Sequence, residues 1–288
     1  SLISKFHKIP LVISDQGGLT THPELNQGSQ IIKKIYSIQN LIIKFIVKQS
    51  SKIIVPNEYE KRIFQKFTND PKIEIVKNGI NLKNIKDIKI NFKEKNNIQN
   101  DFILFLGRFS KVKGIDTLIE SWTIINSKKI SKKIKLVIMG VDFGFEKEME
   151  NMINERGLSD NIIIIKKPSR EEVLAAYKEC LFLVLPSRWE LSPLTPLDGF
   201  AFKKTVISTT AHGIPHTLTN GKNSILVEPE NYSQLSSEIE NLLKNKDLRD
   251  NLGQNGFNLV HNECNSEKMA ENVFKVYQKI LSNKKLKI

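Results

Sequence analysis

The sequence predicts an α/β protein with two Rossmann-like domains, each built on a parallel sheet. Short apolar runs alternate with helical stretches along the chain, which is the pattern of parallel strands joined by crossover helices. Three such strands precede residue 83 and six follow residue 100. Between them, residues 83–100 are rich in Lys and Asn with little apolar pattern, so this stretch is predicted to be the interdomain linker.

The N-terminal elements alternate as strand, helix, strand, helix, strand. Continuous runs such as IIV predict strands buried on both faces, and the longer stretches between them predict helices. The expected strands are 11–14, 53–56 and 73–76, and the expected helices are 29–48 and 58–67. Together with the linker they define a first domain over residues 1–95.

The second domain, residues 96–265, alternates more regularly and is predicted to be a doubly wound sheet. The expected strands are 102–106, 135–139, 162–165, 181–185, 206–208 and 225–227. The expected helices are 115–126, 146–155, 170–180, 196–202, 232–244 and, beyond this domain, 266–281.

Composition narrows the class of protein. The 288 residues are 40% hydrophobic, enough for a real core, and carry a net charge of +13. That charge attracts anionic partners, but no nucleic-acid-binding signature accompanies it, so nucleic acid is not an expected partner. Two distant cysteines support neither a disulfide framework nor a zinc site, and no signal peptide is visible, so a cytoplasmic protein is expected.

Residues 31–47 form the most apolar helix candidate, interrupted by Lys33, Lys34 and Lys44. It is too short and too charged to span a bilayer. We expect it to pack on its own sheet. A peripheral contact with the inner face of the membrane, as a basic amphipathic helix, stays open.

Two segments carry the candidate site. In residues 103–114 an apolar strand is followed by Gly107 and Arg108, and Lys113 and Gly114 lie just before the N-terminus of a helix. The carboxyl ends of parallel strands are where open α/β sheets bind ligands, and helix N-termini favour anions. An Arg and a Lys five residues apart suit a diphosphate.

In residues 185–198 a second buried strand ends at Glu190 and enters a helix that carries Asp198. The two carboxylates suit sugar hydroxyls. The backbone amides of Leu194 and Thr195 lie at the helix start, where they point at a distal phosphate. The two segments predict a site for a nucleotide diphosphate attached to a sugar. Asp198 has a second interpretation, because Thr195 as N-cap, Pro196 at N1 and an acid at N3 make a good helix start.

Three segments resemble those of family 4 glycosyltransferases, which are retaining, metal-independent enzymes with the two-domain GT-B fold. They are GRFSKVKGIDTLIES, LPSRWELSPLTPLDGFAF and HGIPHTLTNGKNSILVEPEN, in the family's order, and the resemblance covers roughly residues 10–285. It implies transfer of a hexose from a UDP- or GDP-sugar to a glycan or lipid-linked acceptor, with no cofactor and no metal.

The resemblance also implies roles for single residues. Arg108 and Lys113 would clamp the diphosphate and neutralise its growing charge, and Glu190 would contact the sugar near the reacting carbon. These three would be catalytic. Gly107, Leu194 and Thr195 would help to bind the donor. Asp198 would bind the ribose, where the family usually has Glu.

At the level of domains, the resemblance implies that residues 266–288 form a helix that packs back on the N-terminal part. It also implies that the N-terminal domain is incomplete, so we expect a dimer or a partner chain to complete it. Departures from the family are Gln16 for His, His216 for Glu, and Lys203 to Thr205 for Gly-x-Pro. They keep two alternatives open: a non-catalytic sugar-nucleotide-binding subunit that needs a partner, and a basic protein that binds polyanions or membrane surfaces.

Overall fold

The computed structural model describes residues 7, 9–14, 30–85, 88–130 and 134–285. The chain forms two compact units. Unit 1 comprises Ser1–Gly79 together with Glu263–Ile288, and unit 2 is the continuous segment Ile80–Asn262. Gln16, where a departure from the family was noted, lies outside the described residues.

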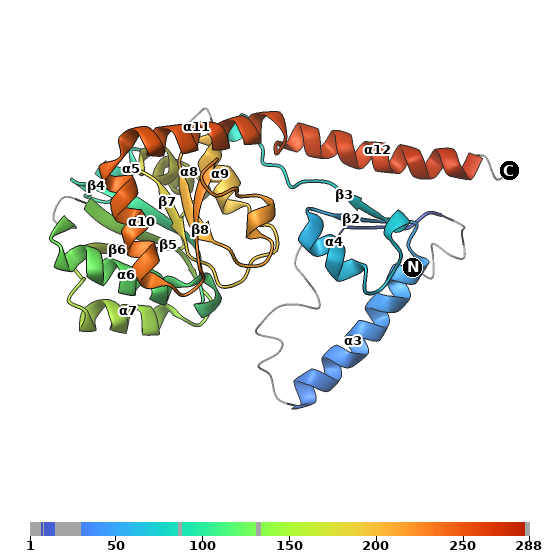
Figure 1. Cartoon of the computed structure of the whole chain (residues 1–288), viewed down its shortest axis with the longest axis horizontal. Helices are drawn as coiled ribbons and strands as arrows, with labels where there is room; N and C mark the ends of the chain where they lie inside the picture. The colour runs from blue at the N-terminus through green and yellow to red at the C-terminus, as the bar shows by residue number, and fades with distance from the viewer. Residues whose placement is uncertain (1–6, 8, 15–29, 86–87, 131–133, 286–288) are drawn as a thin grey trace. The chain divides into compact units, whose positions relative to one another are not determined.

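Unit 2 is built on a six-stranded sheet in which every neighbouring pair of strands is parallel. The order of its strands is β6-β5-β4-β7-β8-β9. They are β4 (Asp101–Phe109), β5 (Ile134–Asp142), β6 (Ile162–Lys166), β7 (Leu183–Leu185), β8 (Val206–Thr209) and β9 (Ser224–Val227). The predicted doubly wound α/β fold is confirmed (Figure 1).

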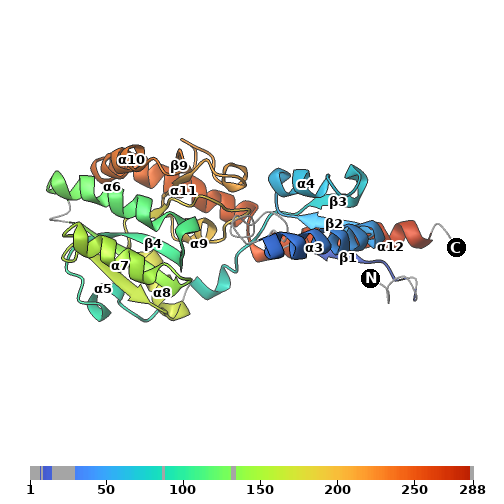
Figure 2. The same cartoon turned by 90° about the horizontal axis from the view of Figure 1, so that it is seen from below.

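Helices cover both faces of this sheet (Figures 1 and 2). They are α5 (Phe92–Lys95), α6 (Ile115–Ser127), α7 (Glu146–Glu155), α8 (Arg170–Glu179), α9 (Thr195–Ala201), α10 (Tyr232–Lys244) and α11 (Lys246–Asn262). The strands run outward from β4 in one direction through β5 and β6, and in the other through β7, β8 and β9. Right-handed crossovers therefore place the crossover helices α6 and α7 on one face and α9 on the other. The helix α10, which follows β9, packs against α6.

The strand order reverses between β4 and β7, and this reversal opens a crevice. The two strands share one register pair, Leu104 with Leu183. Beyond it, β4 continues to Phe109 in register with β5, whereas β7 ends at Leu185. The segments that follow the two strands therefore separate at the edge of the sheet where ligands of such folds bind.

The polar stretch 83–100 differs from its prediction as a linker, because α5 packs into unit 2. Phe92 is fully buried and its ring lies 5.2 Å from that of Phe102. The backbone amides of Phe92 and Lys93 donate to the carboxylate of Glu179 at 2.7 and 2.9 Å. One aromatic anchor, side-chain caps from Glu179 and Asn91, and an ion pair between Lys95 and Glu172 hold the helix. A helix of four residues held in this way has too weak a pattern to detect in the sequence.

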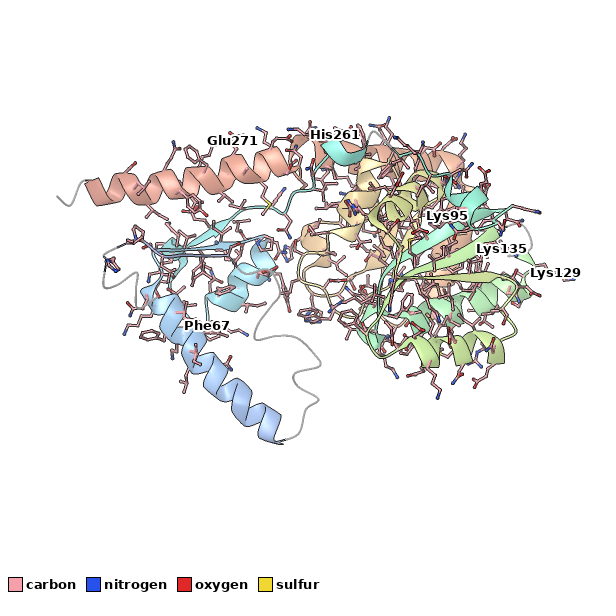
Figure 3. The ribbon with its side chains drawn as sticks, turned by 180° about the vertical axis from the view of Figure 1, so that it is seen from behind. Phe67, Lys95, Lys129, Lys135, His261 and Glu271 are labelled. Atoms are coloured by element: carbon pink, nitrogen blue, oxygen red, sulfur yellow. The ribbon has the colours of Figure 1, made fainter. Side chains whose placement is uncertain are left out.

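Unit 1 holds a three-stranded parallel sheet in the order β1-β2-β3. Its strands are β1 (Val12–Ser14), β2 (Lys52–Val55) and β3 (Ile73–Ile75), and its helices are α3 (Gln30–Gln49), α4 (Glu58–Phe64) and α12 (Ser266–Lys285). Val47 of α3 and Phe64 of α4 pack with Ile53 of β2, and Phe67 lies against this cluster (Figure 3).

The last helix, α12, also belongs to unit 1. Val276 of α12 packs with Ile54 of β2 and Val76 in a second cluster, joined by Met269 and Ile280. The C-terminal helix therefore covers strands from the beginning of the chain. Among the described residues, no helix has the length and apolar character needed to cross a membrane.

Candidate functional site

A cavity of about 230 Å³ lies at the carboxyl ends of β4 and β7, and every residue that lines it belongs to unit 2. The lining residues are Phe105, Leu106, Gly107, Arg108, Lys113, Leu185, Ser187, Glu190, Pro193, Thr195, Pro196 and Ser208. The structure thus brings together five of the seven residues that the sequence singled out. The other two, Leu194 and Asp198, do not line the cavity.

Arg108 is exposed at the end of β4, and its guanidinium lies 5.0 Å from the centre of the Phe143 ring. An arginine over an aromatic face is held by a cation–π interaction while its N–H donors stay available. Within the described part of the chain, no carboxylate pairs with this guanidinium. Arg108 is therefore an uncompensated cation beside the cavity, suited to an anionic ligand.

Lys113 follows on a single 3-10 turn, Lys111–Lys113, at the start of α6. The turn ends at Gly114, whose φ of +68° and close approach to Pro186 fit glycine alone: an added Cβ would lie 2.0 Å from the Pro186 carbonyl oxygen. Lys113 Nζ forms an ion pair with Glu190 Oε1. The Ser187 hydroxyl donates to the same oxygen at 3.2 Å.

This ion pair is largely shielded from water, since the side chains of Lys113 and Glu190 are 16% and 17% exposed. The charges of the two residues balance each other. A diphosphate that enters the cavity would compete with Glu190 for the ammonium group. The sequence indicated separate roles for these two residues and gave no sign that they touch.

The start of α9 differs from its prediction by one residue. Leu194 occupies the N-cap position without a side-chain cap, the helix begins at Thr195, and Pro196 is the second helical residue. Thr195 was predicted as the N-cap, and a shift of one residue is the usual uncertainty of helix ends. The Thr195 amide keeps its expected place because the first helical N–H groups have no intrahelical partner. The Leu194 side chain is 48% exposed.

Asp198 lies one turn further along α9 and is held by Arg170 of α8. Both carboxylate oxygens accept from the guanidinium at 3.3 Å. Burial alone would lower the pKa of Arg170, but these bonds and the charge of Asp198 raise it above its ordinary value. Asp198 is thus neither the N3 residue of a capping motif nor an unpaired acceptor. A ribose would have to share it with Arg170.

Sequence reasoning missed three residues around the cavity: Ser187, Arg188 and Phe143. The first two stand inside a segment already singled out, LPSRWELSPLTPLD, and follow the end of a strand as Glu190 does. The position of Phe143 could be read only as one more strand end. Over the described ranges, no group of three or more His, Cys, Asp or Glu side chains is placed to hold a metal ion.

A crevice at the reversal of a doubly wound sheet, with cations at its strand ends, defines an α/β protein that binds phosphate-bearing ligands. Residues 86–259 match the family model described as glycosyl transferases group 1. The chain belongs to this family, and its two parallel-sheet units have the GT-B-like fold that the sequence predicted.

Curated relatives agree with this assignment. An uncharacterized glycosyltransferase of Methanocaldococcus jannaschii is 32% identical over 274 residues, which are 90% of this chain and 74% of the relative. The capsular polysaccharide biosynthesis glycosyltransferase CapM of Staphylococcus aureus is 28% identical over 190 residues, 64% of this chain and 48% of its own length. The chain therefore spans from about half to three quarters of these two relatives.

Solved structures share the fold. Sucrose-phosphate synthase from Thermosynechococcus elongatus superposes with a TM-score of 0.78 at 20% identity, over 94% of this chain and 68% of that one. HepE of Anabaena, solved in complex with UDP-glucose, superposes with a TM-score of 0.80 at 15% identity, over 96% of this chain and 74% of that one.

Proposed function

We propose that this chain is the donor-binding part of a retaining glycosyltransferase that moves a hexose from a UDP- or GDP-sugar to a glycan or lipid-linked acceptor. The observation that carries the proposal is Arg108, an exposed guanidinium with no carboxylate partner in the described residues, at the reversal of the sheet. Membership of a glycosyltransferase family and the complex of HepE with UDP-glucose support a sugar nucleotide as its ligand.

In this proposal Arg108 and Lys113 bind the diphosphate. Gly107 lets the β4 backbone approach it closely, and the amides of Leu194 and Thr195 face the distal phosphate. As the bond between the sugar and the diphosphate breaks, negative charge grows on the leaving oxygen, and the two cations stabilise it. They supply the charge that a metal would otherwise give, so the proposed reaction needs none.

Glu190 acts on the sugar. Once a diphosphate draws Lys113 away, the Glu190 carboxylate is released toward the reacting carbon. The acceptor oxygen attacks from the face that the diphosphate leaves, and the leaving phosphate oxygen takes the acceptor proton. Configuration is retained because the bond that forms and the bond that breaks lie on the same face.

Calorimetric titration with UDP, GDP and ADP tests the site. We expect one nucleotide to bind, and Arg108→Ala to weaken it about 10- to 100-fold, since a hydrogen bond to a charged group contributes roughly 1.5–3 kcal/mol. Lys111→Ala is the matched control, because Lys111 is 65% exposed, pairs with Glu148 at 3.6 Å and does not line the cavity. A folded chain that binds none of the three nucleotides contradicts the proposal.

Turnover is tested next with sugar nucleotides of the base so identified. Proton NMR should show that the first product, the sugar transferred to water or to an added acceptor, keeps the anomeric configuration of the donor. The rate of sugar transfer should be unchanged when EDTA is added. Inversion would contradict the retaining mechanism, and loss of activity in EDTA would contradict metal independence. Binding without turnover would favour the non-catalytic subunit over the enzyme.

A further inference from the structure

Arg188 stands behind the cavity and forms polar contacts in three directions. Its guanidinium donates to both oxygens of Asp116 at 2.6 and 2.8 Å. It also donates to the Lys111 carbonyl at 2.6 Å and to Glu230 at 2.9 Å. The side chain is only 22% exposed and is not among the lining residues. A planar guanidinium that forms one bidentate pair and several single hydrogen bonds holds the segments that carry its acceptors in place.

Two of those directions lead to the turn that carries Lys113. The Lys111 carbonyl belongs to this turn, and Asp116 lies in the first turn of the helix that follows it. The backbone amide of Arg188 adds a bond to the carbonyl of Val112 at 2.8 Å. The third direction, toward Glu230, leads away from Lys113 to the segment after β9.

Arg188 and Gly114 thus attach the Lys113 turn to the segment after β7, which also carries Glu190. The contact of Gly114 with Pro186 fixes one end of the turn, and the contacts of Arg188 with Lys111 and Val112 fix the other. The meeting of Lys113 and Glu190 follows from this attachment. Placement matters here, since a displacement of about 1 Å in a catalytic group costs on the order of 100-fold in rate.

Arg188 also neutralises Asp116. This carboxylate lies three residues from Lys113 and would otherwise compete with the diphosphate for the ammonium group. Paired with Arg188 through both oxygens, and 16% exposed, it is occupied. Loss of the guanidinium would free a negative charge beside the cation that the diphosphate needs.

We propose that Arg188 is a positioning residue for the donor diphosphate: it holds the turn that bears Lys113 and keeps Asp116 engaged, without touching the ligand. This inference rests on the proposed function. It makes a sharp prediction, because an effect that passes through Lys113 must disappear when Lys113 is absent.

The test is a double-mutant cycle on the affinity of UDP, or of whichever nucleoside diphosphate the wild type binds. We expect Arg188→Met to weaken binding about tenfold when Lys113 is present and to have no further effect in Lys113→Ala. Binding of the parent nucleoside, followed by ligand-observed NMR, should not change, because it has no phosphate. Arg188→Lys, which keeps the charge but not the fork, should fall between Met and the wild type. Glu230→Ala, which removes only the bond that leads away from the turn, should leave affinity unchanged.

Each outcome decides one question. Equal losses in the wild-type and Lys113→Ala backgrounds, or an equal loss for the nucleoside, would mean that Arg188 only supports the fold and would overturn the inference. Wild-type affinity in Arg188→Met would overturn it as well, while the proposed function would stand. A folded wild type that binds no nucleotide would overturn both. If Arg188→Met fails to fold, Arg188→Lys carries the same cycle.

Discussion

Arg108 and Lys113 carry the same charge but have different surroundings. Arg108 rests on an aromatic ring and is exposed to water, whereas Lys113 is shielded and already paired with a carboxylate. An anion that reaches Arg108 displaces only water. The same anion must displace Glu190 from Lys113, so the apparent affinity for a bare nucleotide contains the cost of separating that ion pair.

Glu190→Gln separates these effects. We expect the affinity for the bare nucleoside diphosphate to rise several-fold, because the charge that competes for Lys113 is gone, while sugar transfer falls by at least 100-fold. Calorimetry and a transfer assay measure the two. The control is Glu148→Gln, whose partner Lys111 lies outside the cavity. A parallel loss of nucleotide binding and transfer would show that Glu190 supports the fold rather than the sugar.

At the scale of elements, the strands were predictable and two helices were not. Each of the nine described strands contains a short run with apolar residues. α11 was missed because KDLRDNLGQNGFNLVHN has few apolar residues and two glycines, which are poor helix formers. The fold uses those glycines for close packing. A Cβ on Gly253 would meet the Lys203 carbonyl oxygen at 2.1 Å, and one on Gly256 would meet the Phe200 ring at 2.2 Å.

In the candidate site, too, some features were predictable from the sequence and others were not. Arg108 lies at the end of β4, and Lys113 and Glu190 follow the ends of β4 and β7, so their gathering at one edge follows from a parallel sheet. The Arg170 partner of Asp198 lies 28 residues away on another helix, and the ring of Phe143 comes from the end of β5. Such partners depend on how elements pack, which no local pattern in the sequence contains.

An ion pair between two helices of unit 2 predicts how the stability of this unit depends on pH. Glu240 of α10 bonds to Lys128 at the end of α6 at 2.7 Å and to Lys244 on its own helix, and these bonds lower its pKa to about 2. A carboxyl whose pKa is lowered by folding stabilises the fold above its unfolded pKa, near 4.5. That stabilisation disappears as pH falls from about 4.5 to about 2. We expect the free energy of unfolding of unit 2 to fall less steeply over this window in Glu240→Gln.

Urea unfolding followed by tryptophan fluorescence measures the free energy of unfolding of unit 2, because both tryptophans of the chain, Trp122 and Trp189, lie in this unit. Glu238→Gln, two residues earlier on the same helix, is the control. If the free energy of unfolding depended on pH in the same way in the wild type and in Glu240→Gln, the lowered pKa assigned to Glu240 would be contradicted.

At the scale of the whole molecule, the cavity and its supports belong to one continuous segment. Every lining residue, and each residue that Arg188 contacts, falls within unit 2.

We therefore expect residues 80–262, made alone, to fold and to bind the nucleoside diphosphate within about threefold of the intact chain. Circular dichroism and a cooperative fluorescence transition would establish folding, and calorimetry the affinity. The same fragment with Arg108→Ala is the control for specific binding. A folded fragment that has lost the nucleotide would mean that unit 1 contributes to the site.

The return of α12 to the first strands bears on how the chain is made. Unit 1 combines residues that precede unit 2 with residues that follow it, so its sheet cannot gain the cover of α12 until that helix has been synthesised. Unit 2 is continuous and can fold as soon as Asn262 leaves the ribosome. Domains usually fold in the order of synthesis. In this chain unit 1 departs from that order, because β1, β2 and β3 are made before unit 2 but gain the cover of α12 only after it.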